Sequence, residues 1–191
     1  FKETNLSVVG YSVSVDKKMS LEELLPLIYT QPDQPDAIPY VTSYYKERFG
    51  FCMTEKQKTA LPEDIYHVFI DSVLEKGNLT YGELFIPSTE GNADEIFFST
   101  YICHPSMANN EISGPAVAIY LAKWLLEQKQ RRYGVRMIFV PETIGAITYL
   151  SRHVDEMKKR VRAGFNISCV GDDRTYSYVA SRYGDTLADK V

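Results

Sequence analysis

The chain has 191 residues, 45% of them hydrophobic, and a formal net charge of −4. The hydrophobic fraction is that of an ordinary globular protein with a sizeable core. The negative charge and the lack of any Lys/Arg cluster argue against a nucleic-acid partner. No apolar run is long enough to span a bilayer and the first residues do not resemble a signal peptide, so we also expect no membrane partner.

The three cysteines, Cys52, Cys103 and Cys169, form an odd and scattered set without a CxxC pair. This pattern favours reduced thiols over a disulfide framework or a zinc knuckle, and it predicts a cytoplasmic protein. The chain opens on Phe1 instead of Met and stops in residues 186–191, which look like the first turn of a helix. We therefore expect a fragment of a longer protein.

The first half of the sequence is typical of a β-rich, antiparallel domain, which we place at residues 1–90. Residues 6–15 alternate between apolar and polar side chains and predict a strand. A capping box begins a helix predicted over residues 20–29. Residues 66–74 and 79–86 read as two strands around a Lys-Gly-Asn turn, which predicts a hairpin.

The second half changes to a pattern in which strands and helices alternate, and we place this domain at residues 91–191. The predicted elements are a strand at 95–102, a helix at 111–128, a strand at 135–140, helical residues 143–162 and a strand at 165–170. Such alternation predicts an α/β fold with a mainly parallel sheet and helices on both faces.

Residues that could bind a metal or take part in catalysis follow the ends of the three predicted strands. In a parallel sheet, ligands bind beyond the carboxyl ends of the strands. The candidates there are His104 and Asn110 after the first strand, Glu142 after the second, and Asp172, Asp173 and Arg174 after the third. Zinc needs about three protein ligands of the His/Asp/Glu type and an open position for water. A nearby Glu can then take the proton from that water.

Each of these side chains also has a structural alternative. His104 could be a hydrogen-bonded loop residue, and Glu142 could favour the N-terminal dipole of the next helix. Asn110 could be an N-cap. The segment 172–174 could be a solvated turn with an internal ion pair.

Five segments together carry a resemblance to a known family. They are VGYS at 9–12, IPYVTSYYKER at 38–48, ICHPS at 102–106, PETIG at 141–145 and CVGD at 169–172. The chain resembles bacterial proteins with an aminopeptidase-like domain, often labelled as associated with polysaccharide biosynthesis. The resemblance implies a phosphorylase/hydrolase-like core similar to the zinc exopeptidases, into which a small β-rich domain is inserted. Residues 1–90 would be the inserted domain and 91–191 part of the core.

The resemblance to the di-zinc aminopeptidases also implies roles for single positions. His104 stands at the place of a histidine ligand and Glu142 at the place of the general base. Asn110 stands at the place of the bridging aspartate, Thr143 at that of a glutamate ligand and Ser168 at that of a further aspartate. The neutral amide of Asn110 offers one oxygen and no charge, so the resemblance implies at most one zinc ion.

These observations predict a zinc-dependent, aminopeptidase-like hydrolase that attacks a peptide or amide bond with metal-activated water. His104 and Asn110 would bind the metal, Glu142 would be the base, and Asp172, Asp173 and Arg174 would bind a small peptide-like substrate. The alternative is a non-catalytic aminopeptidase-like module that binds its ligand during surface polysaccharide biosynthesis. A third interpretation treats the aromatic-rich first half as a surface for a protein partner.

Overall fold

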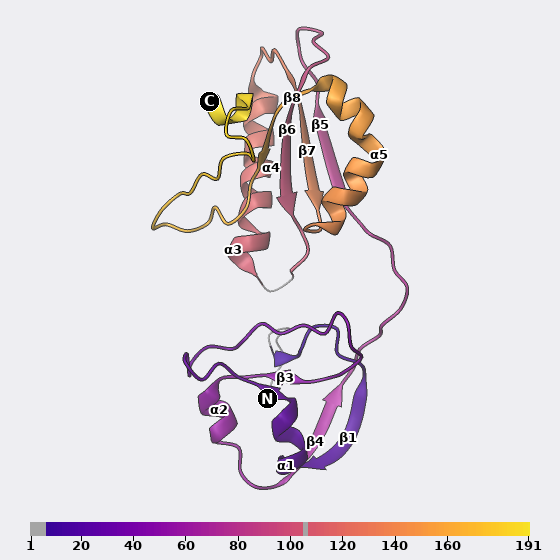
Figure 1. Cartoon of the computed structure of the whole chain (residues 1–191), viewed down its shortest axis with the longest axis vertical. Coiled ribbons are helices and arrows are strands. Elements are labelled where there is room, and N and C mark those ends of the chain that lie inside the picture. Colours follow the sequence, from indigo (N-terminus) through magenta and orange to yellow (C-terminus); the bar gives the residue numbers. More distant parts are fainter. Residues whose placement is uncertain (1–6, 105–106) are drawn as a thin grey trace. The chain divides into compact units, whose positions relative to one another are not determined.

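The computed structural model describes residues 7–104 and 107–191, and its contacts divide the chain into two compact units, Phe1–Gly77 and Asn78–Val191 (Figure 1). The division lies after Gly77 and not after residue 90, because the strand over residues 82–86 pairs inside the second unit. In the described part of the chain, no helix combines the length and the hydrophobicity that crossing a membrane requires.

The first unit contains two small sheets. Strand β1 (Val15–Ser20) pairs antiparallel with β4 (Ile65–Ile70), and β2 (Ile28–Tyr29) pairs parallel with β3 (Phe51–Cys52). Two short helices, α1 (Leu21–Leu24) and α2 (Glu55–Thr59), each begin with a capping box. The core consists of Met19, Leu24, Ile28, Met53 and Val68.

Two predictions in this unit need correction. The helix predicted to residue 29 begins at its capping box but ends as a 3₁₀ turn, Leu25–Leu27, which contains Pro26. The strand predicted at 6–15 is replaced by two isolated bridges, Val8 to Phe51 and Gly10 to Thr42. The chain turns at Tyr11, whose φ of 63° does not belong to a strand.

The predicted hairpin is wrong, because its two strands belong to different units. Strand β4 pairs with β1, and β5 (Gly82–Ile86) pairs antiparallel with β7 (Gly134–Val140). Val68 and Ile70 are buried in the first unit, whereas Ile86 belongs to a core cluster of the second unit. The Lys-Gly-Asn segment therefore joins two cores instead of closing a turn.

The second unit is an α/β layer structure, as predicted. Its four-stranded sheet has the order β5-β7-β6-β8, in which β6 (Glu95–Tyr101), β7 and β8 (Val161–Asn166) are parallel. The helices are α3 (Ala108–Glu111), α4 (Ser113–Glu127) and α5 (Ile144–Arg160), and a 3₁₀ helix spans Leu187–Lys190. Strand β8 follows α5 directly and so begins before the predicted residues 165–170.

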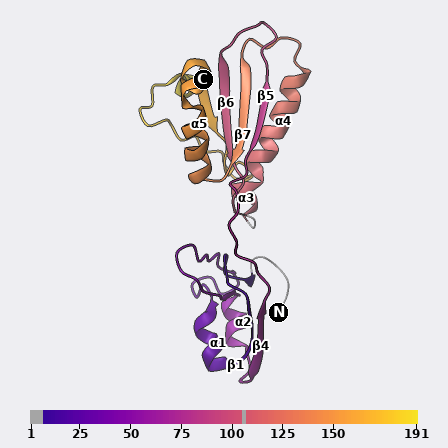
Figure 2. The same cartoon turned by 90° about the vertical axis from the view of Figure 1, so that its right-hand side faces the viewer.

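The two long helices cover opposite faces of this sheet (Figures 1 and 2). Alternate residues of the central strand β7 pack in different clusters. Val135 and Met137 pack with α4, whereas Ile138 and Val140 pack with Tyr149 of α5. A central strand buried on both faces is apolar along most of its length, which is why the sequence identified β7 correctly despite Arg136.

One arginine ties the α5 face together. Arg136 of β7 is 7% exposed and donates to both carboxylate oxygens of Glu95 in β6, at 2.7 and 3.1 Å. It also donates to Glu83 of β5 at 2.7 Å, and to Tyr149 and Glu156 of α5 at 3.3 and 3.2 Å. A single guanidinium of β7 thus contacts both neighbouring strands and a helix, and its pair with Glu95 has the bidentate geometry of a strong ion pair.

These contacts set the protonation of the buried groups. Burial by itself raises the pKa of Glu95, but the hydrogen bonds and charges of Arg136 and Arg160 outweigh burial, so the pKa lies below its ordinary value. Burial raises the pKa of Tyr149 to about 12. Tyr149 therefore stays protonated and donates to Glu83 at 3.1 Å.

We predict that Arg136→Met destabilises the second unit by about 3–5 kcal/mol, because it removes the bidentate partner of the buried Glu95 carboxylate and leaves only the longer contact with Arg160 at 3.4 Å. Urea unfolding followed by the fluorescence of the single tryptophan, Trp124 of α4, measures this unit. The matched control is Arg162→Met, which removes a partly exposed pair with Asp94 and should shift the midpoint only slightly. Equal effects of the two substitutions would contradict the prediction.

The same unfolding experiment should show a dependence on pH. Because the folded-state pKa of Glu95 is lowered from 4.5, its contribution to stability is complete above that value and is lost as the pH falls through the folded-state pKa. Glu95→Gln should be less stable than the wild type at neutral pH and should lose less stability between neutral pH and about pH 3. Parallel curves for the two proteins would show that Glu95 has no depressed pKa.

Gly114 determines how closely α4 approaches the sheet. A Cβ atom at this position would lie 2.2 Å from Thr100 Oγ1 and 2.4 Å from the carbonyl oxygen of Ile167. We predict that Gly114→Ala costs at least about 1–3 kcal/mol, since the helix must move away from the strands. Gly82→Ala is the control, because its Cβ would find only ordinary contact with Phe139 at 3.5 Å. Urea unfolding compares the two variants.

Candidate functional site

His104 and Glu142 meet where the parallel strands β6 and β7 end. The register pairs Tyr101 with Val140, and the N–H of Ile102 extends the ladder to Val140 O at 3.1 Å. The segments that follow β6 and β7 then leave the sheet at the same edge. His104 Nε2 lies 3.3 Å from Glu142 Oε2, and their side chains are 24% and 45% exposed. The structure thus brings together the two predicted residues on which the proposed chemistry depends.

The backbone after β7 holds Glu142 in place. Thr143 has a φ of 59°, which is rare for a β-branched residue, and α5 begins immediately after it. Gly145 allows this turn, since a Cβ there would lie 2.7 Å from Pro141 Cδ and 2.9 Å from Val140 Cβ. Such strained positions concentrate at functional sites. Glu142 also lies beside the N-terminus of α5, so the helix-dipole explanation is compatible with a role in the site.

Cys103 is part of the same group, although the sequence predicted only a reduced thiol there. Ligand atoms of Cys103, His104 and Glu142 all lie within 4.8 Å of one another. The thiol sulfur accepts a hydrogen bond from the Glu142 N–H at 3.2 Å. The only signal in the sequence was its position next to His104 at a strand end.

A buried carboxylate, that of Glu111, forms a hydrogen bond with the backbone of Cys103. Glu111 of α3 is 8% exposed and accepts a hydrogen bond from the Cys103 N–H, and its carboxylate lies 3.7 Å from the Cys103 sulfur. Burial raises the pKa of the Cys103 thiol, and the negative charges of Glu111 and Glu142 add to this despite the hydrogen bond from the Glu142 N–H. The sequence places Glu111 among the polar residues after the first strand but assigns it no role, and its contact with Cys103 is seen only in the structure.

Helix α3 is joined to the loop that follows β8. Asn109 Oδ1 accepts from Gly171 N at 2.8 Å, and Asn110 Nδ2 approaches Cys169 Sγ at 3.7 Å. Asn110 lies inside α3, so the N-cap explanation is wrong. Its Oδ1 atom is buried and has no hydrogen-bond partner among residues 7–104 and 107–191. This oxygen can accept a proton donor or a cation.

The predicted substrate-binding residues form a solvated turn. Arg174 NH2 lies 2.6 Å from Asp172 Oδ2, and Asp173 is exposed. The hydrogen bonds from Arg174 hold the pKa of Asp172 below its usual range. This is the ion pair of the structural alternative. The substrate-binding role of Asp172, Asp173 and Arg174 stays a prediction.

The residues at the strand ends fit one zinc ion better than two. Cysteine, histidine and glutamate are usual donors for zinc, and Cys103, His104 and Glu142 lie together here. Thr143 and Ser168 offer no carboxylate for a second ion. The donor set is therefore compatible with a single ion held by His104 and its neighbours.

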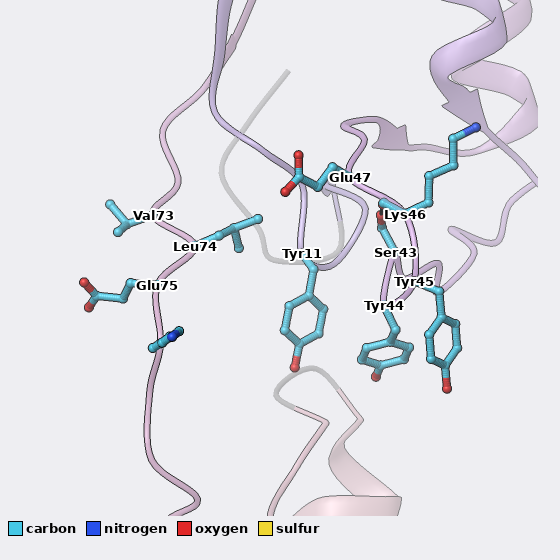
Figure 3. Close-up of a pocket in the computed structure, with 10 residues that line it drawn as sticks. Tyr11, Ser43, Tyr44, Tyr45, Lys46, Glu47, Val73, Leu74 and Glu75 are labelled. Atoms are coloured by element: carbon cyan, nitrogen blue, oxygen red, sulfur yellow. Dashed lines mark hydrogen bonds between the residues drawn. The ribbon is translucent and has the colours of Figure 1, made fainter.

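A second concave surface lies within the first unit (Figure 3). This cavity of about 710 Å³ is lined by Tyr11, Tyr44 and Tyr45 on one side and by Val73 and Leu74 on another. Figure 3 shows the three tyrosine rings extending in the same direction, and the rings of Tyr11 and Tyr44 are 5.0 Å apart. This is the aromatic surface on which the partner-binding interpretation depends.

Comparisons with known proteins agree with the predicted relationship. A Clostridium acetobutylicum protein is 47% identical over 191 residues, which is 100% of this chain and 43% of that protein. Its name assigns it provisionally to polysaccharide biosynthesis and gives it an aminopeptidase-like domain. A crystal structure from Clostridium acetobutylicum, provisionally named a peptidase, has a TM-score of 0.90 at 46% identity and matches 97% of this chain and 43% of its own.

The chain spans less than half the length of these two relatives. The match to the family described as Domain of unknown function (DUF4910) extends over residues 9–191. The resemblance to bacterial aminopeptidase-like proteins is thereby confirmed, and the chain belongs to the DUF4910 family.

Proposed function

We propose that this chain carries part of the active site of a metal-dependent hydrolase that cleaves a peptide or amide bond. The observation that carries the proposal is the 3.3 Å approach of His104 Nε2 to Glu142 Oε2 at the ends of β6 and β7. The aminopeptidase-like domain and the peptidase in the names of the two relatives support the same reaction class.

In this proposal some residues bind the metal ion or the substrate, and Glu142 transfers protons. His104 would hold the ion, and the unpartnered Oδ1 of Asn110 is the weaker donor. When bound, zinc would polarise the carbonyl under attack and would lower the pKa of its bound water to near neutral pH. Glu142 takes the proton of the attacking water and passes it to the leaving amine, and its side chain is 45% exposed, so that a substrate can reach it. Asp172 and Arg174 would contact the polar ends of a small peptide-like substrate.

The non-catalytic alternative has its own observation. The positions of Asn110, Thr143 and Ser168 carry no carboxylate, although carboxylates are the ligands that hold two cations close together. A pocket of this kind could retain a ligand without cleaving it, in keeping with the polysaccharide biosynthesis in the name of the Clostridium relative. Metal content and turnover distinguish the two functions.

We expect the purified protein to bind about one zinc ion per chain. His104→Ala should lose the ion, whereas Glu142→Gln should keep it and lose turnover of aminoacyl substrates by at least about 100-fold, because only the base is removed. Metal analysis and an aminopeptidase assay measure the two effects.

The control is His67→Ala, which removes an exposed partner of Asp16 in the first unit and should change neither quantity. A protein without metal and without turnover would rule out the hydrolase and favour the binding module.

A further inference from the structure

We propose that Cys103 binds the metal ion beside His104 as a thiolate, so that the site selects a borderline-soft cation such as Zn²⁺ over Mg²⁺, Ca²⁺ or Mn²⁺. This inference rests on the metal site of the proposed function and adds a ligand to it. It also determines which class of cation the protein takes.

The first argument is distance. Cys103 Sγ, a ring nitrogen of His104 and a carboxylate oxygen of Glu142 lie within 4.8 Å of one another. Two ligands of one tetrahedral zinc ion, with bonds of about 2.3 Å to sulfur and 2.0 Å to nitrogen, are themselves about 3.5 Å apart. The difference is small enough for a side-chain rotation to close.

The second argument is the environment of the sulfur. The Glu142 N–H donates to Cys103 Sγ at 3.2 Å, and hydrogen bonds of this kind to a metal-bound sulfur orient it and tune the metal. On the other side, Glu111 accepts from the Cys103 N–H and fixes the backbone of this strand end. Hydrogen bonds therefore fix both the sulfur and the backbone N–H of Cys103, as outer partners fix a metal ligand.

The third argument is charge and ligand number. A catalytic zinc site needs about three protein ligands. If Glu142 serves as the base, His104 and the neutral Asn110 leave the ion short of an anionic donor. Cys103 supplies it, and a thiolate favours zinc and cobalt over cations that prefer oxygen.

Cobalt substitution tests the inference with a readout that is independent of activity. The chain loaded with Co²⁺ should show the intense near-ultraviolet charge-transfer band of a cobalt thiolate. Cys103→Ser should lose this band and weaken zinc binding by more than the roughly 10–100-fold that loss of an outer partner costs. Glu111→Gln, which changes only such a partner, should keep the band.

Cys169→Ser is the matched control, because Cys169 is the other thiol close to the strand ends and contacts Asn110 at 3.7 Å. It should keep the band. Cobalt that binds without the band, or a band lost in Cys169→Ser and kept in Cys103→Ser, would overturn the inference and leave the hydrolase standing. A protein that binds neither zinc nor cobalt would overturn both.

A second measurement covers the case in which Cys103→Ser fails to fold. Alkylation of the wild-type protein with iodoacetamide, followed by peptide mapping, should be suppressed by zinc at Cys103 and unchanged at the exposed Cys169. Magnesium should protect neither thiol. Equal alkylation of Cys103 with and without bound zinc would refute its role as a ligand.

Discussion

The buried guanidinium of Arg136 is the interaction on which the second unit depends. It joins β5, β6, β7 and α5 through Glu83, Glu95, Tyr149 and Glu156. Ion pairs of this kind cost desolvation energy and yield little net stability, but they penalise every arrangement that leaves one partner alone. The network therefore fixes how α5 lies on the sheet and how the strands are aligned, more than it adds to the total free energy.

That alignment is what creates the candidate site. The parallel register of β6 and β7 brings Cys103 and His104 to the same edge of the sheet as Glu142. On the opposite face, Gly114 lets α4 lie against the strands, so that α3 and Glu111 reach Cys103 from behind. The α5 face combines the Arg136 ion pairs with apolar packing, the α4 face is packed by apolar side chains, and the strand ends lie between the two.

Electrostatics also make this edge a favourable place for a cation. The carboxylates of Glu111 and Glu142 both lie close to the Cys103 sulfur, and the imidazole of His104 is 3.3 Å from Glu142. Partly buried anionic groups attract a divalent ion more strongly than they would in water. The cavity of the first unit differs in kind, since three exposed tyrosine side chains are part of its lining.

Local patterns in the sequence determined the elements of the second unit and the residues at the strand ends. A buried strand, an amphipathic helix and a capping box are periodic or short-range signals, so β6, α4, β7 and the start of α1 could be read directly. His104 and Glu142 could be paired because parallel strands end at one edge of a sheet. The relationship to aminopeptidase-like proteins followed from short motifs in the same way.

Only the tertiary structure decided which strands pair and which side chains join the site. β4 and β5 carry a good hairpin signal, yet each pairs in a different core, because the choice of partner depends on where Val68 and Ile86 become buried. The contact between Cys103 and Glu111 could not be predicted either, since it depends on the packing of α3 against the end of β6. A sequence encodes the period of an element locally, but burial and contact are properties of the whole fold.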